Sequence, residues 1–296
     1  MNPEDLRFLL ELGRSGRLGE AARTLGVDET TVSRRISRLE AQLGVRLFDR
    51  GRSGWRLSEA GRQLQPFAES IEATVAAAVD RVASEPGTLT GRVRLMTTDG
   101  FGAYLLIPGL GELRRRHPGL ELEIYTATSR GSLTERDFDV AVTLERPSSR
   151  GAFVRRLCDY ELRLYASADY LREHGTPASL DEVRTDHTLI WYLDAVLDVE
   201  PLRLLDEVLP RARAQIQTNN ITGHVEAARA GVGIAPLPSY IGQRDPSLRP
   251  VLPERFRVER SYWLVVPKDL AALARVRATA QAVTDIVRAD PHLRPA

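Results

Sequence analysis

The chain has 296 residues, of which 43% are hydrophobic and 27% charged, so it can form two or more globular units. Its net charge of +1 excludes a uniformly basic packaging protein, and its apolar runs fall short of the ~20 residues that a membrane-spanning helix needs. Cys158 is the only cysteine, and Glu4 and Asp5 precede the first apolar run, so we expect no intrachain disulfide, no signal peptide and a cytoplasmic location.

The first part of the chain predicts three helices. Residues 4–13 carry leucines at helical spacing and should close a small core. In the second helix Ala21 and Ala22 share one face and are small enough to let two helices pack closely. Gly26 follows, where a tight turn needs a small or left-handed residue. Asp28 can then cap the third helix.

The third helix has an apolar stripe on one side and a basic face on the other. The stripe consists of Val32, Ile36, Leu39 and Leu43, and the opposite side carries Thr31, Arg34, Arg35 and Arg38. A short helix, a tight turn and a basic second helix form the helix-turn-helix arrangement, which inserts its second helix in the major groove of DNA. The alternative is an ordinary helical hairpin with a solvated arginine face.

A small β-wing is expected after these helices. Residues 47–61 predict a strand, a turn with glycine, a second strand and the start of a new helix. Between Arg34 and Arg56 there are seven arginines and two acidic residues, a local net charge of +5. The positive charge is therefore concentrated where a duplex backbone would lie, which favours DNA binding over the plain hairpin.

A set of residues in this region matches one known family in order and spacing. They are Ala21-Ala22, Val32-Ser33, Ile36, Leu39-Glu40, Leu43-Gly44, Leu47-Phe48, Arg50 and Ala60-Gly61. In these residues the chain resembles the LysR-type transcriptional regulators. It departs from the usual family pattern at Leu18, where an aromatic is common, at Thr30-Thr31, and at Ser58, where threonine is usual. None of these departures removes a helix or a charge.

DNA contacts are expected from the third helix and the wing. Arg34 and Arg38 lie one helical turn apart and are the best candidates for reading bases or backbone. Hydroxyls near the start of the helix can reach phosphates or base edges, and the wing arginines suit phosphates or the minor groove. The alternative for one of these arginines is an ion pair with Glu40 or Asp49. The predicted DNA-binding residues are Thr30, Thr31, Ser33, Arg34, Arg38, Arg50 and Arg52.

A long helix is predicted from Glu59 to about Ala83, with Ser58 as its cap and a bend at Pro66. Its apolar positions alternate in steps of three and four, as in a coiled-coil seam: Ala60, Leu64, Phe67, Ile71, Thr74, Val75, Ala78 and Val82. A single helix would leave this seam exposed, so we expect it to pair with the same helix of a second subunit. The alternative is that it packs on the chain's own second domain. The family resemblance also implies a dimerising linker helix.

Beyond a hinge at residues 84–88, strands alternate with helices, which predicts a mostly parallel sheet with helices on both faces. Strands are expected at 93–96, 120–124, 139–143, 188–190, 214–218 and 262–266, and helices at 103–116, 128–136, 168–174, 222–230 and 270–289. Two crossings, near 161–165 and 261–265, would join two lobes, and 191–212 should be loop and short helix. This part resembles the effector domain of the family, itself similar to periplasmic solute-binding proteins.

The predicted fold class is α/β, with an N-terminal winged helix-turn-helix, a long linker helix and a two-lobed periplasmic-binding-protein-like effector domain. The DNA-binding domain is expected at 1–60, the linker helix at 61–87 and the effector-binding domain at 88–296. Lobe 1 would comprise 91–163 and 265–296, and lobe 2 would comprise 164–264.

An effector site is expected between the lobes, because open parallel sheets leave a crevice at the carboxyl ends of their strands. Hydroxyls and amides at helix starts suit a small anion, and the resemblance implies a small metabolite, often a carboxylate. Asp99 would oppose an anion or simply cap its own helix, and capping alone is the alternative for each hydroxyl. The predicted effector-binding residues are Thr97, Thr98, Asp99, Phe101, Thr128, Ser129, Thr143, Trp191, Thr218, Asn219, Asn220 and Ile221.

The sequence thus predicts a transcriptional regulator that binds double-stranded promoter DNA and is modulated by a small organic effector. A homodimer is expected, with a homotetramer and RNA polymerase as further partners, and without a membrane, metal or cofactor. The five scattered histidines show no metal-ligand spacing, and no nucleophile elbow, phosphate loop or dinucleotide fingerprint points to an enzyme. The alternatives are a constitutive DNA-binding repressor or activator without ligand, and a solute-binding or enzymatic protein with a helical dimerisation arm.

Overall fold

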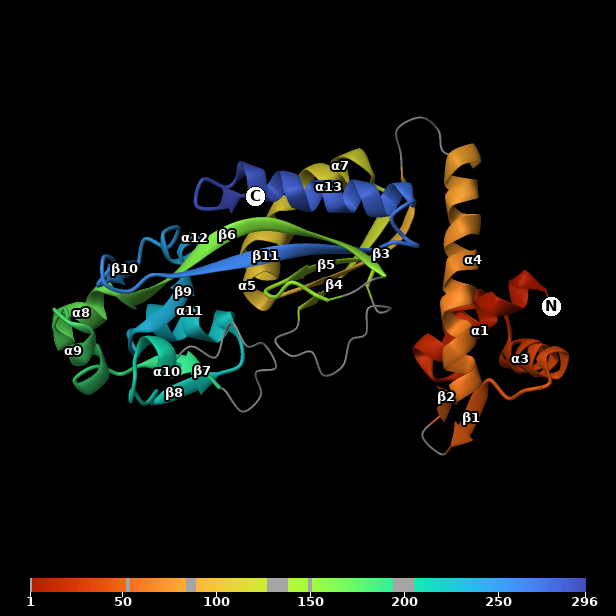
Figure 1. Ribbon diagram of the computed structural model, residues 1–296, viewed down its shortest axis with the longest axis horizontal. Coiled ribbons are helices and arrows are strands. Elements are labelled where there is room, and N and C mark those ends of the chain that lie inside the picture. Colours follow the sequence, from red (N-terminus) through yellow and green to blue (C-terminus); the bar gives the residue numbers. More distant parts are fainter. Residues whose placement is uncertain (1, 52–53, 84–88, 127–137, 149–150, 194–204) are drawn as a thin grey trace. The chain divides into compact units, whose positions relative to one another are not determined.

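The computed structural model in Figure 1 describes residues 2–51, 54–83, 89–126, 138–148, 151–193 and 205–296. The chain divides into two units, Met1–Ser84 (unit 1) and Glu85–Ala296 (unit 2), which are described separately below. No helix among the described residues is both long and apolar enough to cross a membrane.

Unit 1 contains the predicted three helices, wing and long helix. Its elements are α1 (Pro3–Ser15), α2 (Leu18–Leu25), α3 (Glu29–Leu43), β1 (Phe48–Gly51), β2 (Gly54–Leu57) and α4 (Glu59–Ala83). The core is formed by leucines of α1, the small residues Ala21 and Ala22 of α2, and the stripe Val32, Ile36 and Leu39 of α3. Leu43, the last member of the predicted stripe, is 38% exposed because it lies at the end of α3, beyond the reach of this core.

The turns of unit 1 follow from local chemistry. Gly26 ends α2 in the left-handed region at φ 69°, where a residue without Cβ avoids strain. The wing strands are antiparallel, with Phe48 opposite Leu57, and the Trp55 N–H donates to the Gly16 carbonyl at 2.8 Å. This bond attaches the wing to the end of α1. Gly61 is required for packing, since a Cβ there would meet the Leu47 carbonyl oxygen at 2.2 Å.

Helix α4 has the predicted bounds, and Ser58 caps it by accepting the Gly61 N–H at 3.1 Å. Its apolar residues, however, do not form one uniform exposed seam. Ala68 is buried in the core of unit 1, and Leu64 and Ile71 pack against that core. Phe67 and Val75 are 67% and 57% exposed. Part of the predicted seam therefore packs on the core of unit 1. The sequence-based alternatives were pairing with a second subunit and packing on the chain's second domain, so neither describes this contact.

Unit 2 is built on an eight-stranded sheet with the order β10-β6-β11-β5-β3-β4, in which β9 and β12 also pair with β6. Its strands are β3 (Gly91–Thr97), β4 (Leu120–Thr126), β5 (Val140–Thr143), β6 (Ala152–Ser167), β9 (Ala235–Pro238), β10 (Leu248–Val251), β11 (Val258–Pro267) and β12 (Arg294–Pro295). A separate two-stranded sheet pairs β7 (Ile190–Tyr192) with β8 (Ile216–Thr218) in parallel.

The expectation of a mostly parallel sheet is wrong for the described strands of unit 2. Strand β3 pairs in parallel with β4 and β5, but the pairs made by β6 and β11 are antiparallel. The reason is that the two crossings between lobes are themselves long neighbouring strands. The crossing expected near 161–165 is only the last part of β6, which begins at Ala152.

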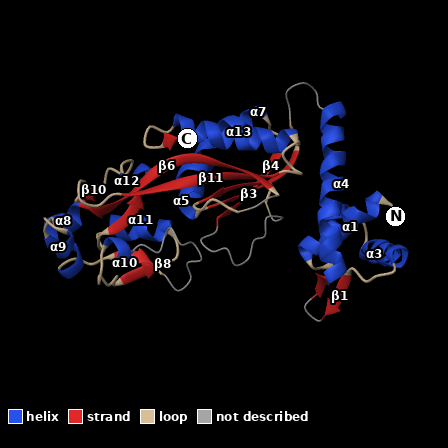
Figure 2. Ribbon diagram, in the orientation of Figure 1, coloured by secondary structure: helices blue, strands red, loops and turns tan. Residues whose placement is uncertain are grey.

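The helices of unit 2 match the predicted positions in most cases. They are α5 (Asp99–Phe101), a π-helical turn η1 (Gly102–Leu106), α6 (Ile107–Gly109), α7 (Gly111–Arg116), α8 (Ala168–His174), α9 (Leu180–Thr185), α10 (Leu205–Val208), α11 (Ile221–Arg229), α12 (Ser239–Gly242) and α13 (Ala274–Ala289). The helical segment predicted at 103–116 begins at Asp99 instead, and α9 and α12 were not predicted. The helix predicted at 128–136 lies outside the described residues. Helix α13 packs against β3, β5 and β6 and runs beside α7 (Figure 2).

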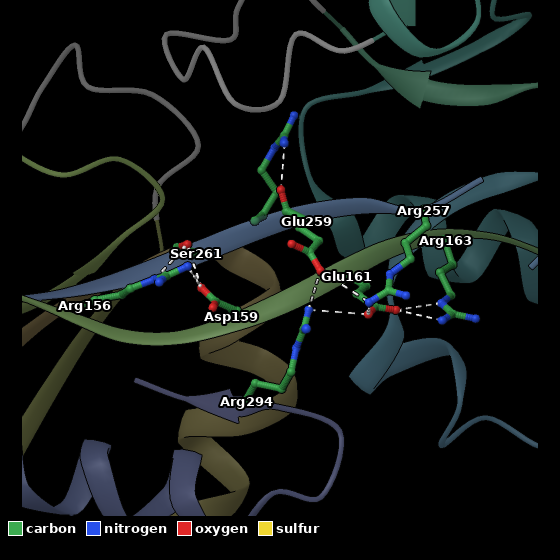
Figure 3. Close-up of polar contacts among 9 residues, drawn as sticks. Arg156, Asp159, Glu161, Arg163, Arg257, Glu259, Ser261 and Arg294 are labelled. Carbon is green, nitrogen blue, oxygen red and sulfur yellow. Dashed lines mark hydrogen bonds and ion pairs between the residues drawn. The ribbon is translucent and has the colours of Figure 1, made fainter. Parts of the chain in front are cut away.

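The two crossing strands are joined by ion pairs where they lie side by side (Figure 3). Glu161 of β6 and Glu259 of β11 are cross-strand neighbours, which would repel each other without counterions. Arg257 lies 2.6 Å from Glu161 and 3.3 Å from Glu259, and Arg294 lies 3.5 Å and 2.8 Å from the same two carboxylates. Because Arg294 belongs to β12, the cluster fastens the last strand of the chain to both crossings.

Candidate DNA interface and effector site

The exposed face of α3 carries two arginines one turn apart. Arg34 and Arg38 are both exposed, and neither forms an ion pair with any described residue. Of the hydroxyl residues predicted beside them, Thr30 is exposed, whereas Thr31 and Ser33 are half-buried. The two guanidinium groups are therefore available to a partner outside the chain.

Asp28 caps the start of α3, as predicted. Its Oδ1 accepts the Thr31 N–H at 2.7 Å, and its Oδ2 accepts the Thr31 hydroxyl at 2.9 Å. The Thr30 hydroxyl donates to the same carboxylate. Both threonine hydroxyl hydrogens are therefore used inside the protein, and each hydroxyl presents only oxygen lone pairs to an external group.

The Asp28 cap should make the stability of the protein depend on pH. The hydrogen bonds from Thr30 and Thr31 lower the pKa of Asp28 from 3.8 to about 2. Because the folded-state pKa lies below the ordinary value, this stabilisation is present above pH of about 4 and is lost as the pH falls toward about 2. We expect Asp28→Ala to lower the urea midpoint of unfolding near neutral pH, with the difference from the unsubstituted protein shrinking across that range.

The control for this prediction is Asp49→Ala, which removes an exposed carboxylate of the wing. Near neutral pH its difference from the unsubstituted protein should be much smaller than that of Asp28→Ala, because Asp49 lies in strand β1 and not at a helix start. A constant difference for Asp28→Ala over the whole range would contradict the capping account.

Arg35 does not share the exposed face with Arg34 and Arg38, in contrast to the prediction. Its Nη1 lies 2.9 Å from Oδ1 of Asp5, a carboxylate with no exposed surface, and its guanidinium lies 5.4 Å from the Phe8 ring centroid. A buried carboxylate needs a cation beside it, so Arg35 turns toward α1. Arg35 therefore stabilises the fold of unit 1.

In the wing, Arg50 makes the ion pair that the sequence left as an alternative. It lies 3.6 Å from Glu40 and 4.3 Å from the Trp55 ring centroid, and it remains 53% exposed. The other oxygen of Glu40 accepts the Leu47 and Phe48 N–H groups at 2.8 and 3.2 Å. Glu40 thus fixes both the start of the wing and its arginine. Arg52 lies outside the described residues.

Three of the predicted effector residues, Asp99, Asn220 and Ile221, lie at the start of α11. Asp99 Oδ2 accepts both the N–H of Thr222, at 3.0 Å, and its hydroxyl, at 2.9 Å. Asn220 caps the same helix by accepting the Gly223 N–H at 2.6 Å. Asp99 therefore caps α11 rather than its own helix, a contact that the sequence alone does not predict because the two segments are far apart in the chain.

Several of the other predicted residues are committed to their own loops. Thr143 donates to the Glu145 carbonyl at 2.7 Å, and Thr218 donates to the Asn220 carbonyl at 2.7 Å. Asn219 accepts the side-chain amide of Asn220 at 3.2 Å. Each of these side chains therefore bonds within its own loop. Ile221 is buried, and Thr128 and Ser129 lie outside the described residues.

Three predicted residues are buried polar groups near this site. The Thr97 hydroxyl and the Trp191 indole N–H have no hydrogen-bond partner within the described parts of the chain. The Thr98 hydroxyl is buried next to the Tyr262 phenol. Buried polar groups normally find partners, so unpaired ones are places where an additional molecule can bind.

The crossing strands also carry a cluster of tyrosines that the sequence alone does not single out. Tyr160 stacks on Tyr262 with ring centroids 4.5 Å apart, and the Tyr262 and Tyr240 hydroxyls lie 2.9 Å apart. Phe101, one of the predicted effector residues, packs edge-on against Tyr262 at 4.9 Å. Burial raises the pKa of all three phenols. They are neutral hydrogen-bonding groups that connect α5 to both crossings, and no sequence motif distinguishes them from other core aromatics.

Neither metal binding nor thiol chemistry is indicated by the described residues. Among them no three His, Cys, Asp or Glu side chains come close enough to hold a metal ion. Burial raises the pKa of the Cys158 thiol to about 12, so this thiol is protonated at neutral pH.

Two family models match the chain. The LysR substrate binding domain matches residues 86–288, and the bacterial regulatory helix-turn-helix protein, lysR family, matches residues 3–62. Together they cover both units, and they confirm the predicted fold class of a helix-turn-helix domain followed by a two-lobed substrate-binding domain.

Individual relatives agree with this assignment. The chain is 31% identical over 182 residues to the HTH-type transcriptional regulator CrgA of Neisseria meningitidis, and the match spans 62% of this chain and 61% of that protein. It is 28% identical to the Mau operon transcriptional activator of Paracoccus denitrificans, and that match spans 91% of each.

Solved structures cover nearly the whole chain. The structure of CrgA from Neisseria meningitidis aligns with a TM-score of 0.59 and 26% identity over 97% of this chain and 99% of that one. A full-length OxyR variant from Pseudomonas aeruginosa aligns with a TM-score of 0.76 and 18% identity over 100% and 97%, and this likeness concerns the fold alone.

Proposed function

Because the chain belongs to the family of LysR-type transcriptional regulators, we propose that it binds promoter DNA through unit 1 and a small organic effector through unit 2. The observation that carries the proposal is the pair of exposed arginines without an ion pair, Arg34 and Arg38, on a capped helix beside a wing in the described part of unit 1. This is the geometry in which a recognition helix enters the major groove. The proposal requires no catalytic chemistry, so the protein acts as a regulator and not as an enzyme.

In this proposal the residues of α3 and the wing have different roles. Arg34 and Arg38 contact base edges or the neighbouring backbone, while Thr30, Thr31 and Ser33 line the start of the recognition helix. Arg50, held by Trp55 and Glu40, contacts a phosphate or the minor groove together with Arg52. The pre-ordered guanidinium of Arg50 supports this role, because less side-chain entropy is lost when it binds.

We further propose the domain division 1–60, 61–87 and 88–296, with lobes 91–163 plus 265–296 and 164–264. The exposed Phe67 and Val75 of α4 support a homodimer through this helix. The proposal also includes a homotetramer, RNA polymerase as a partner and a cytoplasmic location, where promoter DNA is found.

Selection of genomic fragments by the purified protein tests the DNA-binding half of this proposal. A mixture of fragments from the source genome is incubated with the full chain, and the bound fragments are sequenced and titrated in gel-shift experiments at fixed salt. We expect enrichment of a few promoter regions, whose specific affinity exceeds non-specific affinity by about 10³-fold or more. Uniform recovery of all fragments would contradict sequence-specific binding.

A second candidate, a DNA-binding regulator without an effector, is favoured by one observation. Asp99 and Asn220 already accept the Thr222 and Gly223 amides, which are two of the donors that a ligand would find at the start of α11. A thermal-shift screen of small acids, amines and neutral metabolites distinguishes the two candidates. A compound that raises the melting temperature supports effector binding, and its absence from a broad screen supports the second candidate.

Any compound found in that screen should bind less tightly when the proposed effector site is altered. Thr98→Ala and Asn220→Ala should each weaken binding, because they remove a buried hydroxyl and an amide beside the start of α11. The loss of one hydrogen bond corresponds to about a three- to tenfold weaker affinity in a titration. Thr185→Ala, an exposed position on α9, is the matched control. Unchanged affinity in both site variants would exclude the proposed site.

A further inference from the structure

One contact of unit 2 joins two segments that lie 123 residues apart in the chain. Asp99, in the first turn after β3, uses one carboxylate oxygen to accept both the backbone N–H and the hydroxyl of Thr222. Thr222 lies in the first turn of α11, a helix of nine residues. A full negative charge therefore occupies the positive end of a helix that belongs to the other lobe of the proposed site.

The backbone around Asp99 is adapted to this contact. A Cβ on Gly100 would meet Cγ2 of Ile221 at 2.8 Å, so a glycine lets α5 approach the start of α11 closely. Asn220 accepts the Gly223 N–H, which fills the second donor of the same turn. Two of the amides that an external anion could use at this helix start are thus already bonded to side chains of the protein.

The charges around Asp99 favour this arrangement. The described residues place no arginine or lysine in an ion pair with it, and Arg229 of α11 is engaged with Asp245 and Glu226. His224, on the same helix, has no exposed surface, and burial lowers its pKa to about 4, so this ring is neutral near pH 7. The Asp99 carboxylate is therefore balanced by the helix start and by Thr222 and not by a cationic side chain of the described residues.

We propose that Asp99 is a built-in anion: its carboxylate takes the place of a ligand's acid group at α11 and holds the two segments together without an external anion. The inference rests on the proposed function in one respect, that the effector site lies here. The proposal limits the chemical class of the effector. The unsubstituted site takes an effector that is neutral or carries a hydrogen-bond donor toward Asp99, and it takes a carboxylate at α11 only when Asp99 is removed.

Amide hydrogen exchange at Thr222 tests this proposal in the full chain. Asp99→Ala should speed exchange of the peptide that begins α11 by about tenfold or more, because a charge-assisted hydrogen bond to that amide is lost. Asp99→Asn keeps an acceptor oxygen without the charge and should give an intermediate rate. Asp285→Ala, which removes an exposed carboxylate from α13, is the control and should leave the rate unchanged.

Acetate serves as the probe for the vacated position. Sodium acetate should restore slow exchange in Asp99→Ala, compared with sodium chloride at equal ionic strength, and should have no such effect on the unsubstituted protein. Unchanged exchange in Asp99→Ala, or equal effects of acetate and chloride on it, would overturn the proposal. Because this readout needs neither DNA nor effector, a negative result here is separable from a failure of DNA binding.

Discussion

Replacing both Arg34 and Arg38 with alanine should abolish specific DNA binding under conditions where the unsubstituted protein binds. Each arginine that reads a guanine in two hydrogen bonds contributes about 1–3 kcal/mol of discrimination, and each phosphate contact contributes a further salt-dependent gain. Each single substitution should therefore weaken specific affinity by roughly ten- to a hundredfold. If an arginine contacts a phosphate instead, its loss reduces the slope of log affinity against log salt by about one unit.

The controls for this prediction separate DNA contact from folding. The exposed pair Arg115 and Arg116 of α7 can be replaced together, which removes the same charge from a surface of unit 2 that is not assigned to DNA. Gel-shift titrations of that double variant should match the unsubstituted protein. The Arg34 and Arg38 variants should keep their melting temperature, because both side chains are exposed. Unchanged operator affinity in both the Arg34 and the Arg38 variants would refute the assignment of the recognition helix.

Phe67→Glu together with Val75→Glu should convert the protein from a dimer to a monomer. The two side chains are 67% and 57% exposed on α4, and burying either against a second copy would remove a large apolar surface from water. Placing two carboxylates there makes the paired helices repel. Operator affinity should then fall by about 10²–10⁴-fold, because two linked heads bind with an effective concentration that a single head lacks.

Analytical ultracentrifugation measures this change of state directly. The matched control is Phe153→Glu, which introduces the same substitution at an exposed phenylalanine of β6 in unit 2. That variant should keep the α4-mediated dimer. A dimer that survives both substitutions on α4 would show that other residues carry the association. Leu64 and Ile71 are unsuitable positions, since they pack on the core of unit 1 and their replacement would also destabilise that core.

Much of the structure of unit 1 can be predicted because it depends on residues that are close together in the sequence. The capping of α3 by Asp28, the turn at Gly26 and the bounds of α4 depend on residues within a few positions of one another. Arg35 was misplaced because its direction is decided by buried Asp5, thirty positions earlier. The predicted exposure of the α4 seam is too large for a similar reason. The spacing of apolar residues along a helix does not show which of them pack on the core of the same unit.

Unit 2 was less predictable because its decisive contacts are distant in sequence. Around Arg155 and Arg156 the long strand β6 lacks a regular alternation of apolar and polar residues. Its antiparallel pairing with β11 joins residues about a hundred positions apart. The contact of Asp99 with Thr222 is of the same kind. The sequence indicates that Asp99 either opposes a bound anion or caps its own helix, but only the structure gives the helix that its carboxylate caps.

The most direct test of the central claim is a footprint of the full chain on a selected genomic fragment, recorded together with the number of protomers bound. The account predicts two protomers that protect two half-sites separated by about 10 base pairs or a multiple of it, with affinity falling steeply as salt increases. A monomeric protein that protects no DNA even at low ionic strength would contradict it.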